Sequence, residues 1–328
     1  MLTAVRVLLF RPPVLAPALA LAAFLPTRQP IVSWPSEDPL DSIWEEPVDL
    51  PSANLFDGPW GSDRAPDPDA PFTLLRATAG RNRAGVLVTD PYGREWDVRA
   101  SMRDAGADAP AEVVVSRVLS AVGYHQPPVY FLPSFTVDDG QSSGASARTH
   151  PGGRFRLHTP PLKDMGSWSW RRNPFVGTQP HQGLLAILLL FDSTDLKDSN
   201  NALYRLSLEG EVEHWYVVRD LGTALGHRGR SGSRDDDAAR YEQSRFIAGL
   251  KNGFVEFANR SAHPELFQQC IRPDDVRWAG GRLAQLSDRQ WHDAFRAGGY
   301  VADVADRFIR KIRLNIEDAQ HVGAAEGP

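Results

Sequence analysis

The chain has a single cysteine, Cys270, among its 328 residues. One cysteine excludes an internal disulfide, and with it the disulfide-rich scaffolds and the zinc sites that are built from several cysteines. Positive charge is not in excess either, because 36 Lys and Arg stand against 41 Asp and Glu, for a formal net charge of −5. Nucleic-acid-binding proteins usually carry a basic domain or stripe, so we expect no nucleic-acid partner.

Long hydrophobic runs are also missing. The run near the start, Val14–Leu25, is shorter than the ~20 residues that a spanning helix needs, so we expect no stable membrane span in the mature chain. With Arg6 and Arg11 before it and small residues such as Ala22 within it, it resembles a secretory signal peptide. Residues 1–30 are therefore predicted to direct export to the periplasm or the exterior. The alternative is a cytoplasmic protein.

Residues 31–70 are rich in proline and aspartate. Proline removes a backbone donor and restricts the chain, which excludes a regular helix or a central strand over most of this segment. We expect an extended arm that is anchored to the body by large aromatic side chains. The candidates for these anchors are Trp34, Trp44, Phe56 and Trp60.

Residues 71–135 are predicted to form a small antiparallel sheet with one helix. The expected strands are 72–78, 86–89, 95–101 and 129–132, and the expected helix is 109–122, which has Pro110 in its first turn and Gly123 at its end. Residues 136–175 contain a stretch rich in Gly, Ser and Asp at 138–153, which indicates a flexible insertion or linker.

Residues 176–322 are predicted to be mainly helical, followed by a tail at 323–328. The helix expected at 181–191 is apolar on all sides and therefore buried. A hairpin is expected from 202–208 and 214–219, and further helices at 238–259, 264–269, 274–286, 288–297 and 304–319. The fold class that follows is α+β, with a small antiparallel sheet part beside a mainly helical part.

Two short motifs flank the expected hairpin. Asp195-Leu-Lys197-Asp-Ser-Asn200 follows the buried helix, and Asp220-Leu221-Gly222 ends the second strand. In this order they resemble the catalytic loop D-L-K-x-x-N and the metal-binding D-F-G of the protein-kinase-like fold. The resemblance covers about residues 71–320 and is nearer to divergent branches, such as the HipA-type and secretory-pathway kinases, than to typical eukaryotic kinases.

The resemblance implies an ATP- and Mg²⁺-dependent phosphotransferase with a two-lobed structure, acting on a hydroxyl of a protein or small molecule. Asp195 would act on the acceptor hydroxyl, and Lys197 would lie near the transferred phosphoryl group. Asn200 and Asp220 would hold Mg²⁺, which prefers oxygen ligands.

The resemblance also assigns residues that would bind the nucleotide. Arg99 lies on the third expected strand, where the family has its lysine, and would contact the phosphates while Glu112 of the following helix holds it. Gly80 and Arg81 lie in the turn that matches the family's glycine-rich loop.

The same positions contain departures from the family pattern. Arginine replaces the lysine at position 99, Ser193-Thr194 replaces His-Arg before Asp195, and few glycines remain in the nucleotide-binding turn. Arginine is larger and planar, so it is not equivalent to lysine. A catalytically inactive kinase-like module that binds a nucleotide or a protein partner therefore remains an alternative, as does an exported structural protein whose resemblance is coincidental.

Overall fold

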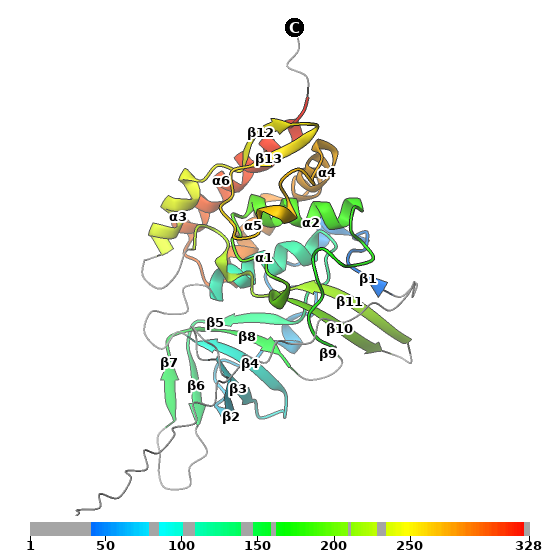
Figure 1. Ribbon diagram of the computed structural model, residues 1–328. Coiled ribbons are helices and arrows are strands. Elements are labelled where there is room, and N and C mark those ends of the chain that lie inside the picture. The colour runs from blue at the N-terminus through cyan, green and yellow to red at the C-terminus, as the bar shows by residue number, and fades with distance from the viewer. Residues whose placement is uncertain are drawn as a thin grey trace, which may run out of the picture.

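The computed structural model describes residues 41–78, 85–100, 109–138, 147–158, 162–208, 211–227 and 234–324. The expected signal peptide lies outside these residues. The described chain forms an α+β structure in which a sheet-rich part lies against a mainly helical part (Figure 1). The predicted fold class is confirmed in this form. No helix among the described residues is both long and apolar enough to cross a membrane.

The sheet-rich part is a seven-stranded sheet in the order β5-β8-β4-β3-β2-β6-β7. All neighbouring strands are antiparallel except β2 and β6, which run parallel. The bounds are β2 Phe72–Thr78, β3 Gly85–Thr89, β4 Glu95–Ala100, β5 Val129–Leu132, β6 Phe135–Asp138, β7 Arg148–His150 and β8 Gly153–Leu157.

The alternation of side chains along β4 divides the sheet into an apolar face and a charged face. Trp96 and Val98 are fully buried in a cluster that also contains Phe155 of β8. Successive side chains of a strand point to opposite faces, so Asp97 and Arg99 lie on the other face. This second face is turned toward the helical part and carries the site described below.

The structure contradicts the linker predicted for 136–175 where it describes strands in this range; residues 139–146 and 159–161 lie outside the described residues. β8 is an inner strand between β5 and β4, and all five of its residues are buried. β6, β7 and the short strand β9, Leu162–Asp164, also lie within the predicted linker. The Gly-Arg-Phe-Arg-Leu of β8 directly follows the stretch rich in Gly and Ser, and both of its arginines are buried.

The helical part contains a second sheet in the order β1-β11-β10-β9. β10, Asn201–Leu208, and β11, Glu211–Val218, form the predicted hairpin, and β1, Asp41–Ser42, adds to β11 in parallel. The helices are α1 Ala109–Ala121, α2 Gln179–Leu190, α3 Arg234–Gln243, α4 Pro273–Leu283, α5 Asp288–Ala297 and α6 Ala302–His321.

The helix predicted at 238–259 is wrong beyond its first turns. α3 ends at Gln243, and a hairpin of β12, Ile247–Lys251, and β13, Phe254–Phe257, follows. Asn252 and Gly253 join these strands with positive φ values of 54° and 82°. Asn-Gly is a strong signal for a tight hairpin turn, and it outweighs the helical pattern here. The helix predicted at 264–269 is only a 3₁₀ turn at Pro264–Leu266, and Cys270 is exposed.

The main hydrophobic core lies in the helical part. α2 is buried on all sides, as predicted, and α1 contributes Val114, Val115 and Val118 to the same cluster. The α1 helix is therefore packed into the helical part, although it follows β4 in the chain. This packing gives the charged face of the sheet a rigid helix to lie against.

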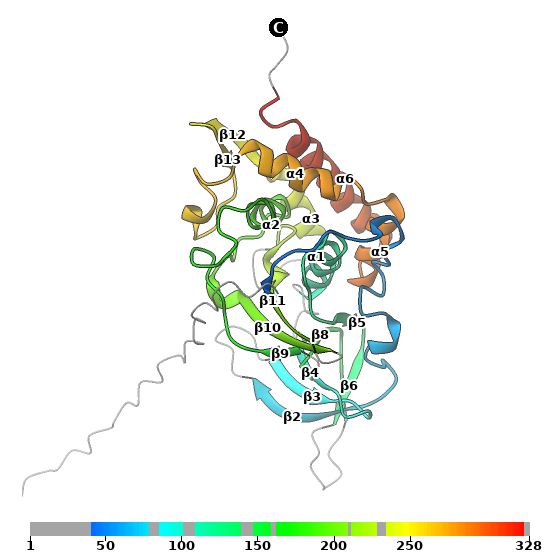
Figure 2. The same cartoon turned by 90° about the vertical axis from the view of Figure 1, so that its right-hand side faces the viewer.

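Residues 41–70 run along both parts of the molecule. Figure 2 shows this segment, in blue, passing α1 and α5 on its way to the sheet. Its Trp44 donates through Nε1 to the Val122 carbonyl (2.7 Å), and Trp60 donates to the Gln126 carbonyl (2.9 Å). The segment is therefore closely attached. Its Leu50 is buried in the main core.

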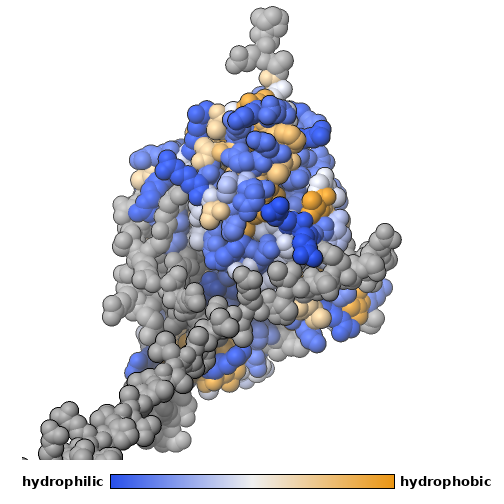
Figure 3. All heavy atoms as spheres, viewed as in Figure 1, coloured by the Kyte–Doolittle hydropathy of each residue, from blue (hydrophilic) through white to orange (hydrophobic). Residues whose placement is uncertain are grey.

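The surface of the described residues shows no broad apolar area in the view of Figure 3. Hydrophilic residues dominate, with hydrophobic residues in small separate groups. The exposed large hydrophobic residues are far apart in the chain, as with Tyr92, Val176 and Val301. The charged face between the two parts is therefore the more informative feature.

Candidate active site

The loop between α2 and β10 is held in shape by its own side chains. Lys197 Nζ lies 2.7 Å from Asp195 Oδ2, and Asn200 donates through Nδ2 to the Asp195 carbonyl (2.8 Å). Asp195 and Lys197 are about one-third and one-half exposed, whereas Asn200 is buried. The loop thus presents a carboxylate and an ammonium group to solvent above a buried amide.

The segment 167–173 packs against this loop and is joined to it by hydrogen bonds. Trp168 and Trp170 are buried, and the Trp170 backbone N–H donates to Asp198 Oδ1 (3.0 Å). Asn201 donates through Nδ2 to the Trp168 carbonyl (3.0 Å). The two tryptophans therefore serve as buried anchors for the loop.

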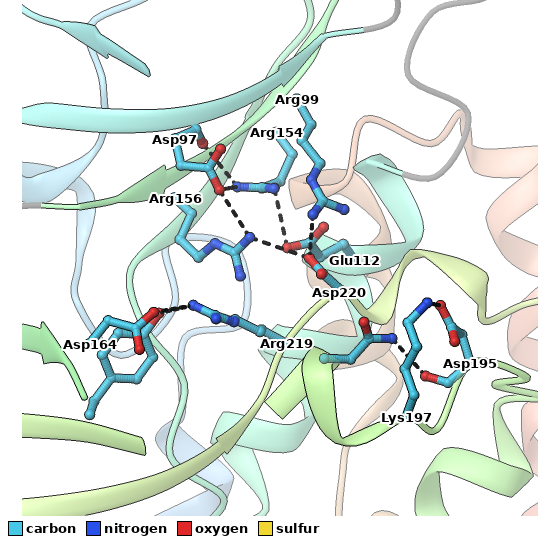
Figure 4. Close-up of polar contacts among 12 residues, drawn as sticks. Asp97, Arg99, Glu112, Arg154, Arg156, Asp164, Asp195, Lys197, Arg219 and Asp220 are labelled. Atoms are coloured by element: carbon cyan, nitrogen blue, oxygen red, sulfur yellow. Dashed lines mark hydrogen bonds and ion pairs between the residues drawn. The ribbon is translucent and has the colours of Figure 1, made fainter. Parts of the chain in front are cut away.

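The loop and the Asp220-Leu221-Gly222 motif lie side by side. The Arg219 backbone N–H donates to the Asn200 carbonyl (2.9 Å), where β10 pairs with β11. Asp220 then adopts a left-handed backbone with φ 59° and ψ 42°, which aspartate tolerates better than most residues. This turn ends the strand and directs the carboxylate toward the sheet-rich part, as Figure 4 shows.

Two arginines of the sheet meet the Asp220 carboxylate. Arg99 Nη2 of β4 lies 2.8 Å from Asp220 Oδ1, and Arg156 Nη2 of β8 lies 3.4 Å from the same oxygen. Arg156 also contacts Asp97 Oδ2 at 3.1 Å. Figure 4 shows these groups converging between the two parts. Asp220 is therefore the point at which the charged face of the sheet is joined to the loops of the helical part.

The arginines set the charge state of Asp220. Burial by itself would raise the pKa of this carboxyl, but Arg156, Arg99, Arg154 and Arg219 outweigh burial and lower its pKa from 3.8 to about 2. The pKa of Asp97 is also lowered, because Arg154 and Arg156 outweigh its burial. Both carboxyls are therefore ionised at neutral pH.

Glu112 does not hold Arg99, contrary to the sequence prediction. Glu112 Oε1 lies 3.2 Å from Nε of Arg154, and both side chains are buried. The physical reason is the position of β8, which pairs with β4 so that Arg154 lies opposite Arg99. Arg154 of β8 is therefore the arginine that lies next to α1 and contacts Glu112, whereas Arg99 of β4 contacts Asp220.

Three residues on the charged face of the sheet were not among the predicted site residues: Asp97, Arg154 and Arg156. The register pairs Asp97 with Arg156 and Arg99 with Arg154, so all four side chains share one face of two neighbouring strands. The alternation of Arg-Phe-Arg beside a buried partner strand is a signal that would have indicated this, once β8 is recognised as an inner strand.

A separate ion pair lies on the hairpin side of the site. Arg219 Nη1 contacts Asp164 Oδ2 of β9 at 2.6 Å and lies 3.4 Å from the Tyr204 hydroxyl of β10. Figure 4 places Asp164 and Arg219 on one side of Asp220, and Asp195 and Lys197 on the other. The site thus extends from β9 to the loop after α2.

The two expected metal ligands, Asn200 and Asp220, are brought together by the backbone contact described above. A carboxylate and an amide oxygen are ligands that Mg²⁺ accepts, so the donor set fits this ion in kind. Among the described residues, no cluster of three His, Cys, Asp or Glu side chains is arranged to hold a metal. A divalent cation would therefore depend on Asp220, one of whose oxygens already faces two guanidinium groups.

The two remaining expected nucleotide-binding residues, Gly80 and Arg81, lie outside the described residues. The other six predicted site residues are all described. Asp195, Lys197 and Asn200 contact one another within their loop, and Arg99 contacts Asp220. The two groups are neighbours because the Arg219 N–H, next to Asp220, donates to the Asn200 carbonyl. Glu112 is linked to Asp220 through Arg154, Asp97 and Arg156.

No protein-family model and no curated protein sequence matches the chain. Among the solved structures that resemble it are three that are kinases by description. The proinflammatory kinase CtkA of Helicobacter pylori has 10% identity and a TM-score of 0.38, over 76% of this chain and 96% of that one. The Golgi casein kinase with Mn/ADP bound has 10% identity and a TM-score of 0.35, over 81% and 75%. The Rio2 kinase of Chaetomium thermophilum, in an ADP/Mg²⁺-phosphoaspartate complex, has 12% identity and a TM-score of 0.31, over 76% and 73%.

Proposed function

We propose that the protein is a kinase-like phosphotransferase that uses ATP with Mg²⁺ and transfers a phosphoryl group to a hydroxyl acceptor. The observation that supports this best is the contact between the Arg219 N–H and the Asn200 carbonyl. It brings the D-L-K-x-x-N loop and Asp220 together opposite the arginines of the sheet. Phosphoryl transfer depends mainly on positioning and on neutralising charge, and this arrangement provides both.

Each residue has a distinct role in this proposal. Asp195 accepts the proton of the acceptor hydroxyl. The oxygen of that hydroxyl forms a bond to the γ-phosphorus of ATP, while the bond between this phosphorus and the departing ADP breaks. Since Lys197 holds Asp195 Oδ2, the other oxygen would accept this proton. Lys197 also offers a positive charge beside the reacting group.

Asp220 and Asn200 would hold Mg²⁺, which would neutralise the polyphosphate when bound. The acceptor is a protein or a small molecule with a free hydroxyl.

The test is transfer of label from radiolabelled ATP with Mg²⁺ by the purified full chain, to itself and to a panel of hydroxyl acceptors. Asp195→Asn and Asp220→Asn are each expected to lower the rate by at least about 100-fold. The exposed Asp69→Asn serves as the matched control and should leave the rate unchanged. A wild-type rate in either site variant would contradict the assigned role.

A second candidate function is a catalytically inactive module that binds a nucleotide. The observation that favours it is the pairing of Asp220 with Arg99 and Arg156, which neutralises the carboxylate without a metal. Such a module would show a rise in Tm with ATP but no label transfer. Absence of any Tm change, with or without Mg²⁺, would contradict both candidates.

A further inference from the structure

Six charged side chains between α1 and the sheet form what we call the inner ion cluster. It contains three carboxylates and three guanidinium groups: Asp97, Glu112, Asp220, Arg99, Arg154 and Arg156. Their formal charges cancel within the protein. The cluster therefore needs no added cation to balance Asp220.

The three arginines differ in how firmly they are held. Arg154 and Arg156 are almost completely buried and each contacts two carboxylates. Arg99 has a side chain that is 33% exposed, and among the described residues it forms an ion pair with Asp220 alone. Arg99 is thus the member of the cluster that can leave without exposing a second carboxylate.

Arg99 also occupies the position beside Asp220 that a bound divalent cation would take. Its Nη2 lies 2.8 Å from Asp220 Oδ1, closer than Arg156 at 3.4 Å. Glu112, which would otherwise hold Arg99 away from Asp220, is engaged by Arg154. The geometry therefore places a guanidinium group directly on an oxygen that a divalent cation would use.

We propose that Arg99 is an internal counter-ion that blocks Asp220 until a divalent cation displaces it. The inference rests on the proposed role of Asp220 as a metal-binding carboxylate. Withdrawal of Arg99 releases a guanidinium group whose geometry suits a phosphate. The blocked form is self-neutralised, so a cation alone is a poor competitor. A cation that arrives with a polyphosphate gives both charged groups a new partner.

The test measures the binding of Mn²⁺ to the full chain in the absence of nucleotide. Binding is monitored by the decrease of the electron paramagnetic resonance signal of free Mn²⁺. Arg99→Met is expected to tighten Mn²⁺ binding about tenfold, because a charge-assisted hydrogen bond of about 1.5 kcal/mol or more no longer competes. The double variant with Asp220→Asn should lose this gain. Arg76→Met, an exposed arginine on β2, is the matched control and should bind Mn²⁺ as the wild type does.

Arg99→Lys provides a second comparison, because it keeps a positive charge beside Asp220. It is expected to bind Mn²⁺ far more weakly than Arg99→Met. Far-ultraviolet circular dichroism of each variant establishes that the fold is retained. Unchanged or weaker Mn²⁺ binding in folded Arg99→Met would overturn the proposal, as would a gain that persists in the double variant.

The measurement is independent of phosphoryl transfer. A gain of Mn²⁺ binding in Arg99→Met, together with no label transfer by the wild type, would support the blocking role and reject the kinase activity. Label transfer by the wild type, together with no gain of Mn²⁺ binding in Arg99→Met, would support the kinase activity and reject the blocking role.

Discussion

Arg154, the second residue of β8, lies with its Nε atom 3.2 Å from Oε1 of Glu112 on α1. Its Nη1 donates to the Asp97 carbonyl at 2.9 Å. A fully buried guanidinium group thus joins the central strands of the sheet to a helix that belongs to the core of the other part. The contact fixes how the two parts of the molecule meet beside Asp220.

Arg154→Met should destabilise the protein strongly. The substitution leaves the Glu112 carboxylate buried without its partner, and breaking a buried ion pair in this way costs about 3–5 kcal/mol. Urea denaturation of the variant measures this loss. Arg76→Met, which changes an exposed arginine, should stay within about 0.5 kcal/mol of the wild type.

Replacing both partners distinguishes ion pairing from packing. In the double variant Arg154→Met/Glu112→Leu no buried charge is left alone, so much of the stability should return. A double variant that is no more stable than Arg154→Met would show that the ion pair is not the cause of the loss.

Acid should weaken the protein through Asp220. Four nearby arginines outweigh burial and lower the pKa of Asp220 from its ordinary 3.8 to about 2 in the folded protein, so the unfolded state binds the proton more readily. The stability from this group is present above pH ~4 and is lost as the pH falls toward ~2. Unfolding free energies at several pH values, followed by fluorescence of the nine tryptophans, should show a steeper decline for the wild type than for Asp220→Asn. Equal slopes would contradict the lowered pKa.

Lys197→Met should affect the reaction and leave the fold intact. Lys197 and Asp195 are both partly exposed, and exposed ion pairs contribute only about 0–1 kcal/mol to stability. Loss of the ammonium group should lower the rate of label transfer with little change in Tm. Lys163→Met, an exposed lysine on β9, is the control. A normal rate in Lys197→Met would remove Lys197 from the site.

Gln290→Glu tests the attachment of the N-terminal segment. Gln290 donates through Nε2 to the carbonyls of Leu50 (2.8 Å) and Ala53 (3.1 Å), while its Oε1 accepts from the Ser287 N–H at the start of α5. Glutamate keeps the acceptor but turns the donor into a second acceptor facing carbonyls. We expect a loss of about 1–3 kcal/mol in thermal or urea unfolding.

The matched control is Gln285→Glu, since the exposed side chain of Gln285 donates through Nε2 to the carbonyl of Gly281 in the preceding turn. It should change the stability little. If both variants unfold alike, the contact of α5 with the N-terminal segment does not contribute as proposed.

Local patterns predicted most of the regular elements. The alternation in 95–101, the capping box of Ser287 and Gln290 and the buried helix before Asp195 all appear in the structure. The strand β8 escaped prediction because its burial depends on pairing with β4, more than 50 residues earlier in the chain. Tertiary contacts of this kind decide whether an arginine-containing strand faces solvent or a carboxylate.

In the candidate site too, the features within one segment were predictable from the sequence, and the contacts between distant segments were not. The resemblance to the D-L-K-x-x-N loop implied that Asp195, Lys197 and Asn200 belong to one site, and the three residues contact one another in one short loop. The partner of Glu112 was not predictable in this way. Arg99 and Arg154 carry the same charge on neighbouring strands, and only the register between β4 and β8 determines which of them reaches α1.

The segment before β2 has a consequence for how the chain can be divided. Gly61 accepts the Tyr130 hydroxyl (2.8 Å) and Ala65 accepts from Arg94 (3.0 Å), while Leu50 lies in the core among the helices. A recombinant version that begins at β2 would thus lack residues that contact the sheet-rich part and residues buried in the helical part. We expect the smallest autonomous folding unit to begin no later than Ile43, whose side chain is itself buried.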